Sequence, residues 1–275
     1  MENRFKDSNI IVDHTSLELV SPENFNAEPH THDMCELLYL KKGTPRYFVE
    51  GKDYKLSKNT LIISRPGDRH RIFFDEPCPY ERYNIIYDET KLPFDFYTVI
   101  PRDIDVITFD SSSIVNELFK KTDYYFEHFE GEVLSHILCN LAEEIFYNAA
   151  IYAKDMPPHI TGASANALVA KAINYINSNL KTIHGLDEIC DSLYITKSHL
   201  HHLFIRHLQT TPKKYILMKK LDIARQAIRS GRRPGDVYLD CGFTDYSTFF
   251  RDYKSFFGHA PSQESDFPPN ISNLS

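Results

Sequence analysis

Four side chains in the first third of the chain have the types and spacing of a metal or effector site. His30 and His32 are one residue apart, Glu36 follows four residues later, and His70 closes a Pro-Gly-Asp-Arg-His run. Imidazole and carboxylate groups bind Fe, Mn, Ni or Zn, and they also orient organic ligands through hydrogen bonds. We expect the four to line the mouth of an effector pocket that needs no cofactor. A divalent metal at the same residues is the alternative.

Short strands must hold these side chains. From Glu36 to Tyr87, runs rich in Leu, Ile, Tyr, Phe and Val alternate with clusters of turn residues, at 43–45, 51–53, 57–59, 66–68 and 77–79. Strands of that length and spacing are typical of a sandwich or a small barrel. The sequence therefore predicts an N-terminal β domain.

Two motifs in this β region resemble those of the cupins. The spacing H-x-H-x3-E-x6-G, which ends at Gly43, resembles the first cupin motif, and P-G-x-x-H, which ends at His70, resembles part of the second. The Asn that usually follows is absent, and Phe74 lies near its place. The resemblance implies a double-sheet, cupin-like (arabinose-binding-like) barrel. In a regulator, resemblance to such a barrel implies a sensor of a sugar or small metabolite.

One pattern occurs twice near the C-terminus. Leu193–Pro212 and Gly242–Pro261 align without a gap at an offset of 49 residues. In each copy a short apolar segment and a turn lead to a candidate N-cap, Thr196 or Asp245, and a second helix follows. The buried positions of these second helices are expected to be Leu200 with Phe249, and Phe204 with Tyr253. Each copy predicts a helix-turn-helix, over 186–206 and 236–255.

The second helix of each copy leaves a polar face free, as a helix that enters a DNA major groove requires. A single helical hairpin could equally belong to an ordinary all-helical domain, but two copies with matching faces favour DNA binding. The residues expected to contact double-stranded DNA are Lys197, Ser198, His201, His202, Arg206, Lys213, Lys214, Tyr246, Ser247, Phe250, Arg251 and Lys254.

A long helix from Tyr215 to Ile228 is expected to join the two units. The segments L-D-E-I-C, Y-I-T-K-S-H-L-H-H-L-F and C-G-F-T-D-Y-S-T-F-F-R-D-Y-K-S-F-F-G-H-A-P resemble the AraC/XylS family of bacterial transcription regulators. The sequence departs from that family at Gln209, Lys220, Tyr238 and Ser265, where Gly, Arg, Ala and Arg are usual. The resemblance implies a DNA-binding regulator that responds to a ligand, and dimerisation through N-terminal helices.

Between Asp110 and Tyr152 the apolar spacing becomes helical. Ser111–Ser113 should open one helix, through Ile114 and Leu118. The apolar stripe of the next consists of Val133, Leu134, Ile137, Leu138, Leu141, Ile145, Phe146 and Ala149. We expect this stripe to pack on the barrel and also to serve a homodimer interface.

These elements predict an α+β protein with two domains. Residues 1–153 would form the cupin-like domain for effector binding and dimerisation. Residues 154–165, which contain paired prolines and a glycine, would form a linker. Residues 166–275 would form the all-α DNA-binding domain, with Ser164 or Asn166 as the cap of its first helix.

The charge is divided in the same way. The net charge of the 275 residues is −7, but residues 165–275 carry 14 basic and 10 acidic residues, whereas residues 1–164 carry 17 and 28. A positive C-terminal half suits DNA.

The five cysteines are an odd number without CxxC spacing, which argues against a disulfide framework or a zinc site. Because no signal-peptide or membrane-length apolar run occurs, we expect a bacterial cytoplasmic protein without membrane contact.

The sequence thus favours a sequence-specific transcription regulator, not an enzyme, that senses a sugar or small metabolite as a homodimer and contacts DNA and RNA polymerase. The competing hypothesis is a metal-dependent cupin enzyme, a dioxygenase or sugar isomerase, with a helical appendage. That alternative leaves the duplicated helix-turn-helix without a role.

Overall fold

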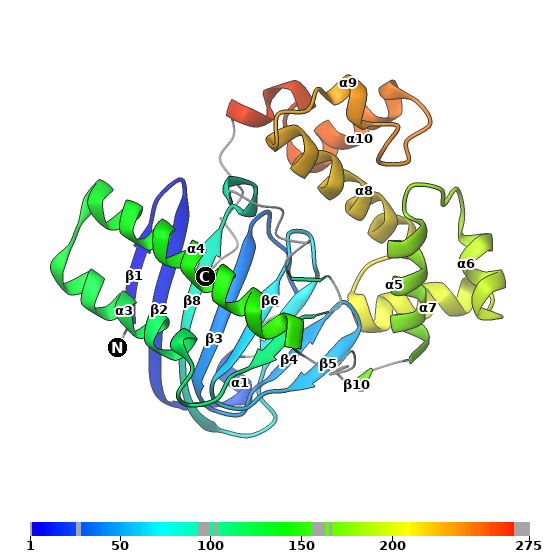
Figure 1. Ribbon diagram of the computed structural model, residues 1–275. Helices are drawn as coiled ribbons and strands as arrows, with labels where there is room; N and C mark the ends of the chain where they lie inside the picture. Colours follow the sequence, from blue (N-terminus) through cyan, green and yellow to red (C-terminus); the bar gives the residue numbers. More distant parts are fainter. Residues whose placement is uncertain are drawn as a thin grey trace. The chain divides into compact units, whose positions relative to one another are not determined.

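The computed structural model describes residues 2–25, 29–92, 100–101, 104–155, 163–164 and 167–266. Contacts divide the chain into two compact units, one drawn mainly from residues 1–49 and 53–163, and the other from 50–52 and 164–270. The first combines β-sheets with two long helices, and the second is helical (Figure 1). The fold class is therefore α+β, as predicted. Most of the expected linker, and the candidate cap Asn166, lie outside the described residues.

Two antiparallel sheets form the N-terminal unit. The larger has the order β1-β2-β8-β3-β6-β9 and the smaller the order β10-β5-β4-β7. The strands are β1 (Glu2–Lys6), β2 (Ile10–Val20), β3 (Cys35–Lys42), β4 (Arg46–Val49), β5 (Lys52–Lys55), β6 (Thr60–Ser64), β7 (His70–Phe73), β8 (Cys78–Tyr87), β9 (Val106–Thr108) and β10 (Ala163–Ser164). The expected turn clusters at 43–45, 57–59 and 66–68 fall between consecutive strands, whereas those at 51–53 and 77–79 overlap the starts of β5 and β8.

Strand β3 shows how the larger sheet separates two cores. Successive side chains of a strand point to opposite faces. Leu37 and Tyr39 pack with the long helices, whereas Leu38 and Leu40 pack with residues of the smaller sheet. The unit is therefore layered as helices, six-stranded sheet and smaller sheet. Glu36 is two residues from Leu38, so its side chain lies on the same face of β3, the face toward the smaller sheet.

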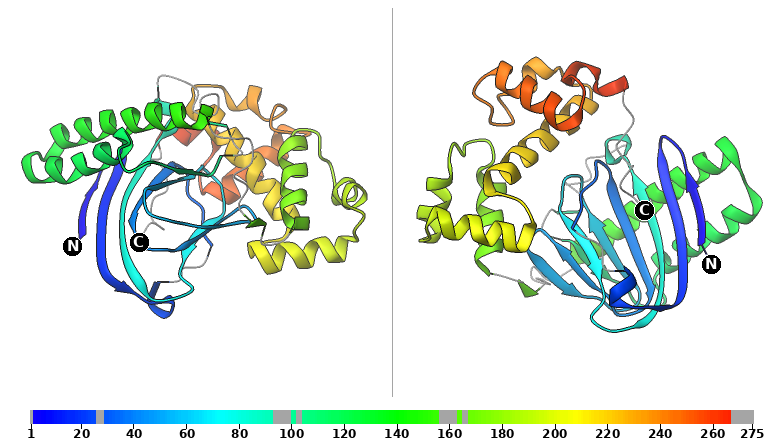
Figure 2. Two further views of the ribbon diagram at one scale, coloured as in Figure 1. Left: turned by 60° about the horizontal axis from the view of Figure 1, so that its bottom comes forward. Right: turned by 180° about the vertical axis from the view of Figure 1, so that it is seen from behind.

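Helices α3 (Ile114–His128) and α4 (Gly131–Asp155) lie against one face of the larger sheet (Figure 2). Ser113 caps α3 by accepting a hydrogen bond from the Val115 amide, as the serine cluster predicted. Most of the predicted stripe of α4 is buried, but Val133 is 58% exposed. Most of the stripe therefore packs inside this unit, as expected, and Val133 is left on the surface. The short helices α1 (Pro22–Phe25) and η1 (Glu89–Lys91) complete this unit.

Helices make up the C-terminal unit. They are α5 (Ala167–Asn179), α6 (Leu186–Leu193), α7 (Lys197–Leu208), α8 (Pro212–Arg229), α9 (Pro234–Val237), α10 (Tyr246–Phe257) and η2 (Pro261–Asp266). Helix α9 is a single turn, so the second helix-turn-helix lacks a first helix of the length of α6. The residues before Gly242, Val237, Leu239 and Cys241, have a spacing of two, and Leu239 is 61% exposed. Within the described ranges, every helix is too short or too polar to cross a bilayer.

Candidate effector and DNA-binding sites

Backbone pairing brings the two motif segments of the N-terminal unit together. His30 and His70 exchange two backbone hydrogen bonds of 3.0 Å, and the Gly67 amide donates to the His32 carbonyl at 3.0 Å. Gly67 has φ +75°, a left-handed conformation that suits glycine in this turn. Glu36 comes from β3 and His70 begins β7, so each sheet supplies part of the cluster.

His32, Glu36 and His70 form a buried polar cluster. The carboxylate oxygen Oε2 of Glu36 lies 3.2 Å from Nε2 of His32 and 3.1 Å from Nε2 of His70. Their side chains are between 1% and 9% exposed. The fourth predicted member, His30, is half-buried, with its ring centroid 4.6 Å from that of His70. The structure therefore brings all four residues together, with three of them at the centre.

The other nitrogen of each buried histidine is already committed. Nδ1 of His32 lies 2.7 Å from the Met34 carbonyl, and Nδ1 of His70 lies 2.8 Å from the Asp68 carbonyl. Because a carbonyl oxygen only accepts, both Nδ1 atoms must donate. In a neutral ring, Nε2 then presents a lone pair, and both lone pairs point at a carboxylate oxygen. Such a group of acceptors is stable only with a positive charge or a hydrogen-bond donor among them.

The electrostatics agree with that requirement. Burial alone would raise the pKa of Glu36, but hydrogen bonds and charge from His32 and His70 hold it well below its usual range. Burial alone would lower the pKa of His32, but the hydrogen bond and charge of Glu36 raise it. The cluster therefore favours an ionised carboxylate next to a cation.

A buried arginine holds the loop beneath this cluster. Arg65 is 1% exposed, and its guanidinium donates to Asp105 at 3.0 Å and to the carbonyls of Pro101 and Ile104 at 2.8 and 2.6 Å. No sequence motif predicted this role, because Arg65 and Asp105 are 40 residues apart. The available signal was a charged residue directly after the mostly apolar strand β6.

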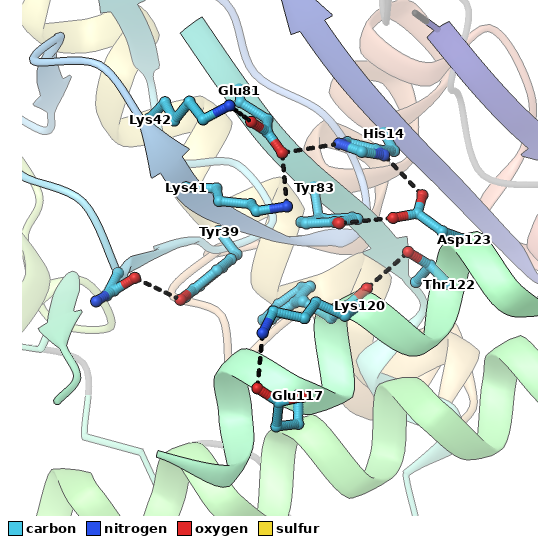
Figure 3. A network of polar contacts seen from close by, with 12 residues as sticks. His14, Tyr39, Lys41, Lys42, Glu81, Tyr83, Glu117, Lys120, Thr122 and Asp123 are labelled. Carbon is cyan, nitrogen blue, oxygen red and sulfur yellow. Dashed lines mark hydrogen bonds and ion pairs between the residues drawn. The ribbon is translucent and has the colours of Figure 1, made fainter. Parts of the chain in front are cut away.

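A second polar network ties the larger sheet to α3, on the opposite face from Glu36 (Figure 3). The Tyr83 hydroxyl donates to Asp123 at 2.7 Å, and Nδ1 of His14 lies 2.6 Å from the other oxygen of that carboxylate. Tyr39 donates to Asn116, also on α3. Strand β3 therefore carries both Glu36 of the buried cluster and a direct contact with α3.

In the C-terminal unit, the two copies of the repeat fold alike where the offset predicts it. Thr196 accepts from the His199 amide at 3.2 Å and Asp245 from the Thr248 amide at 2.8 Å, so both are N-caps. Helices α7 and α10 have 12 residues each, and both end at a left-handed residue, Gln209 or Gly258. Gln209 thus adopts the conformation for which the family usually has glycine.

The predicted DNA contacts lie on the outside of this unit. All twelve are exposed except Phe250, which is half-buried. Arg251 has a side chain that is 73% exposed, with a carboxylate oxygen of Asp252 3.5 Å away. Lys197 forms an exposed ion pair of 2.7 Å with Asp187. A DNA phosphate would compete with Asp187 for this lysine. The opposite faces of α7 and α10, which carry Leu200 and Phe249, are buried.

Lys220 connects α8 to the segment before α6 and to the turn before α10. Its ammonium donates to the carbonyls of Ile183 at 3.1 Å and of Gly242 at 2.8 Å. Burial lowers its pKa. Lysine at this position, where the resemblance predicts arginine, therefore still bridges the two segments.

Two family models match the chain. Residues 17–94 match the AraC-like ligand binding domain, and residues 189–265 match a helix-turn-helix domain. The first range contains the buried cluster, and the second contains both α7 and α10.

Among curated proteins, the chain is similar to the HTH-type transcriptional activator RhaR of Escherichia coli and of Shigella flexneri. In each case 24% of 257 residues are identical, over 88% of both chains. Similar solved structures include ToxT from Vibrio cholerae, at 11% identity and a TM-score of 0.38 over 94% of this chain and 97% of that chain. The AraC-like transcriptional activator CuxR overlaps at 13% identity and a TM-score of 0.37, over 86% and 83%.

Proposed function

We infer that this chain, which belongs to the AraC family of transcription regulators, binds its effector at the His32–Glu36–His70 cluster and reads DNA with α7 and α10. The family membership makes it a ligand-responsive DNA-binding regulator and not an enzyme. The relatives are transcriptional activators, and we propose the same direction of control here.

The observation that supports the DNA contacts is the pair of capped helices at an offset of 49 residues, each with one buried and one exposed face. Two such helices on one connecting helix suit successive major grooves, about 34 Å apart along one face of a duplex. We propose residues 166–275 as the DNA-binding domain and residues 1–153 as the effector and dimerisation domain.

Selection of binding sites from a random DNA library by the full-length protein tests the DNA assignment. The expected result is a preferred site with two blocks of conserved bases about one helical turn apart. Ser198→Ala with His202→Ala should relax the preference in one block, and Ser247→Ala with Arg251→Ala in the other. Wild-type protein that enriches no sequence over bulk DNA would contradict the assignment.

For the effector we propose a small organic molecule whose hydroxyl groups donate to the Glu36 carboxylate and the two Nε2 atoms. When both imidazole rings are neutral, each of these three atoms is an acceptor, and a polyhydroxylated metabolite supplies several donors. His30, at the partly exposed edge of the cluster, would be the outermost contact.

A second candidate occupant is a divalent metal ion, and the same three atoms favour it. Metal–nitrogen and metal–oxygen bonds of roughly 2.0–2.2 Å place neighbouring ligands about 3 Å apart, close to the observed 3.1 and 3.2 Å. The Nδ1 hydrogen bonds to backbone carbonyls are the outer contacts that orient metal-binding histidines. His32, Glu36 and His70 would hold the ion, which would supply a fixed positive charge for an anionic or hydroxylated effector.

Metal analysis and calorimetry of the full-length protein separate the two candidates. If the occupant is organic, dialysed protein should take up no stoichiometric Zn²⁺ or Mn²⁺, and a screen of sugars and hydroxy acids should yield a ligand that His32→Ala abolishes. If it is a metal, one ion per chain should bind and be lost in His32→Ala and His70→Ala. His136→Ala, an exposed histidine on α4, is the control. Failure of both arms would reject the cluster as the effector site.

We further propose that α3 and α4 carry the homodimer interface. Tyr124 on α3 and Val133, Tyr147 and Ile151 on α4 are 54%, 58%, 47% and 59% exposed. Exposed apolar side chains grouped on a helix pair are typical of an interface. Since β3 carries both Glu36 and the Tyr39 contact with α3, it offers a direct path from effector to dimer.

A further inference from the structure

We propose that the N-terminal unit has a second ligand site, for a small multivalent anion such as a phosphorylated or polycarboxylated metabolite. The site is a hollow of about 230 Å³ bordered by β3, β8, α3 and the turn before β6. It lies on the face of the larger sheet that carries Tyr39, opposite the face of Glu36. It is thus distinct from the cluster to which we assign the effector.

The first observation is the charge of the hollow. Lys41, Lys58 and Lys120 line it, and the described residues of the lining include no carboxylate. This is the reverse of the surrounding sequence, in which residues 1–164 carry 17 basic and 28 acidic residues. Three ammonium groups around one hollow attract an anion.

The second observation is that the ammonium groups are only partly neutralised. Lys41 lies 2.7 Å from Glu81, and Lys120 lies 2.7 Å from Glu117, while Lys58 has no ion-pair partner in the part of the chain that the structure describes. An ammonium has three donors, so one carboxylate contact leaves others for a ligand. The Lys120–Glu117 pair is exposed, with side chains 51% and 59% accessible, and a ligand of higher charge can displace it.

The third observation is a rigid floor (Figure 3). The Tyr39 ring stacks on Phe119 with centroids 4.6 Å apart, and the Tyr83 ring stacks on His14 at 4.1 Å. The Asn116 amide donates to two backbone carbonyls at 2.9 Å, which fixes its oxygen toward the Tyr39 hydroxyl. Lys41 also lies 5.5 Å above the Tyr83 ring. Only the lysine side chains must reorganise when a ligand binds.

The size and charge of the hollow select the ligand class. A volume of 230 Å³ corresponds to about eight water molecules, enough for a phosphate or two carboxylates with a few carbon atoms. A monovalent anion gains little, because two of the lysines already face a carboxylate. An anion with two or more charges can contact Lys58 and Lys120 together.

Titration calorimetry of the full-length protein with sodium pyrophosphate and sodium citrate tests the proposal. Wild-type protein should bind at least one of them at a single site, with an affinity that falls as KCl is raised. Lys58→Gln with Lys120→Gln should weaken binding about tenfold or more. Glu117→Gln should tighten it, because that change removes the carboxylate that competes for Lys120. The preferred probe distinguishes phosphate from carboxylate chemistry.

Lys6→Gln with Lys55→Gln is the matched control, since this double variant also removes two positive charges, from exposed positions on β1 and β5. An equal loss in this variant would show that binding depends on overall charge, and the proposal would be wrong. Absence of saturation by either probe up to about 10 mM, or unchanged affinity in the Lys58 and Lys120 double variant, would also overturn it. Because His32 and Glu36 take no part, these results are independent of the assigned effector cluster.

Discussion

Glu264 in the C-terminal unit and Glu36 in the N-terminal unit are both buried at the centre of a polar cluster, and the two clusters differ in what surrounds the carboxylate. Glu264 in the C-terminal unit accepts from Arg225 at 2.6 Å, Arg229 at 2.8 Å and Tyr253 at 2.6 Å. Each of these three groups is a donor, and together they supply the carboxylate at 2.6–2.8 Å, whereas Nε2 of His259 lies further away, at 3.4 Å. Glu36 in the N-terminal unit instead faces two imidazole nitrogens whose rings donate elsewhere.

The difference separates a structural site from a binding site. The carboxylate of Glu264 is supplied with donors by its own fold, so it needs no ligand and stabilises the attachment of η2 to α8 and α10. The cluster around Glu36 is complete only when a proton, a metal or a donor from a ligand enters it. Burial of a carboxylate alone therefore indicates nothing about function, whereas the donor and acceptor roles of its neighbours do.

The largest effect should come from Glu264→Ala. Removing this carboxylate leaves two guanidinium groups without their buried partner, and breaking a buried ion pair costs about 3–5 kcal/mol. Hydrogen exchange of the amides of α8 and α10 in the full-length protein would report the loss locally. Asp240→Ala is the control, because it breaks the exposed Arg232–Asp240 pair of 2.6 Å, for which a much smaller effect is expected. Equal effects would remove the distinction between the clusters.

The same carboxylate predicts a pH dependence. Burial alone would raise the pKa of Glu264, but hydrogen bonding from Tyr253 and the charges and hydrogen bonds of Arg225 and Arg229 lower it below its usual value near 4.5. A lowered folded-state pKa means that the contribution is complete above the unfolded value and is lost as pH falls through the folded one. Glu264→Gln should therefore flatten the acid limb of stability of α8 and α10. An unchanged limb, measured by hydrogen exchange below about pH 5, would show that other acids control it.

Next in size is the effect of Arg251→Ala on base preference. Arginine can donate two hydrogen bonds to a guanine, a contact worth about 1–3 kcal/mol of discrimination, and the Arg251 side chain is 73% exposed on α10. His202, its counterpart at the offset of 49, offers at most one such donor in a neutral ring. Selection from a site library should show relaxed preference at one base position for Arg251→Ala and a smaller change for His202→Ala. A greater change for His202→Ala would reverse the proposed ranking of α7 and α10.

Glu36→Gln is expected to have a smaller effect on stability than Glu264→Ala, and in the opposite direction, because it should stabilise its unit. The carboxylate oxygen lies within 3.2 Å of both Nε2 atoms, so an amide nitrogen in its place can donate one hydrogen bond to each. Each new bond contributes about 1 kcal/mol, so the ligand-free N-terminal unit should become more stable while its response to effector is lost. Melting curves near pH 9, where histidine is mostly neutral, provide the measurement. Lower stability at that pH would mean that an imidazolium, and not an external ligand, completes the cluster.

The sequence predicted the C-terminal helices better than the N-terminal strands, for physical reasons. N-caps, helix length and the buried positions of α7 and α10 depend on residues close in sequence, and the repeat supplied each prediction twice. Strand β1 was missed because Glu2–Lys6 is mostly polar and a strand at the edge of a sheet needs few apolar residues. Strand β2 lies inside the sheet and was missed although it begins with three apolar residues. The helix-turn-helix predicted over 236–255 implied a longer first helix than α9, which ends at Val237. The spacing of two between Val237, Leu239 and Cys241 is not the spacing of a helix.

The buried cluster was predictable in composition but not in chemistry. Residue types and spacing grouped His32, Glu36 and His70, and backbone pairing of His30 with His70 brings the segments together. The donor and acceptor roles of the imidazole nitrogens depend on the backbone carbonyls of Met34 and Asp68. Every residue has a backbone carbonyl, so the sequence does not show which ones a histidine will contact. Arg65 and Asp105 were not found, because their contact depends on tertiary structure alone.

The smallest effects should come from the exposed lysines in the first turn of α8. Lys213 and Lys214 are exposed in the first turn of α8, where the helix N-terminus also favours a phosphate. Each phosphate contact releases about one counterion, so Lys213→Ala or Lys214→Ala should weaken all DNA sequences alike and reduce the salt slope by about 0.9. Binding isotherms on specific and random DNA across KCl concentrations would measure both quantities, with the exposed Lys171→Ala on α5 as control. A change in base preference would show that these lysines contact bases instead. An unchanged slope in both variants would place the phosphate backbone elsewhere on the unit.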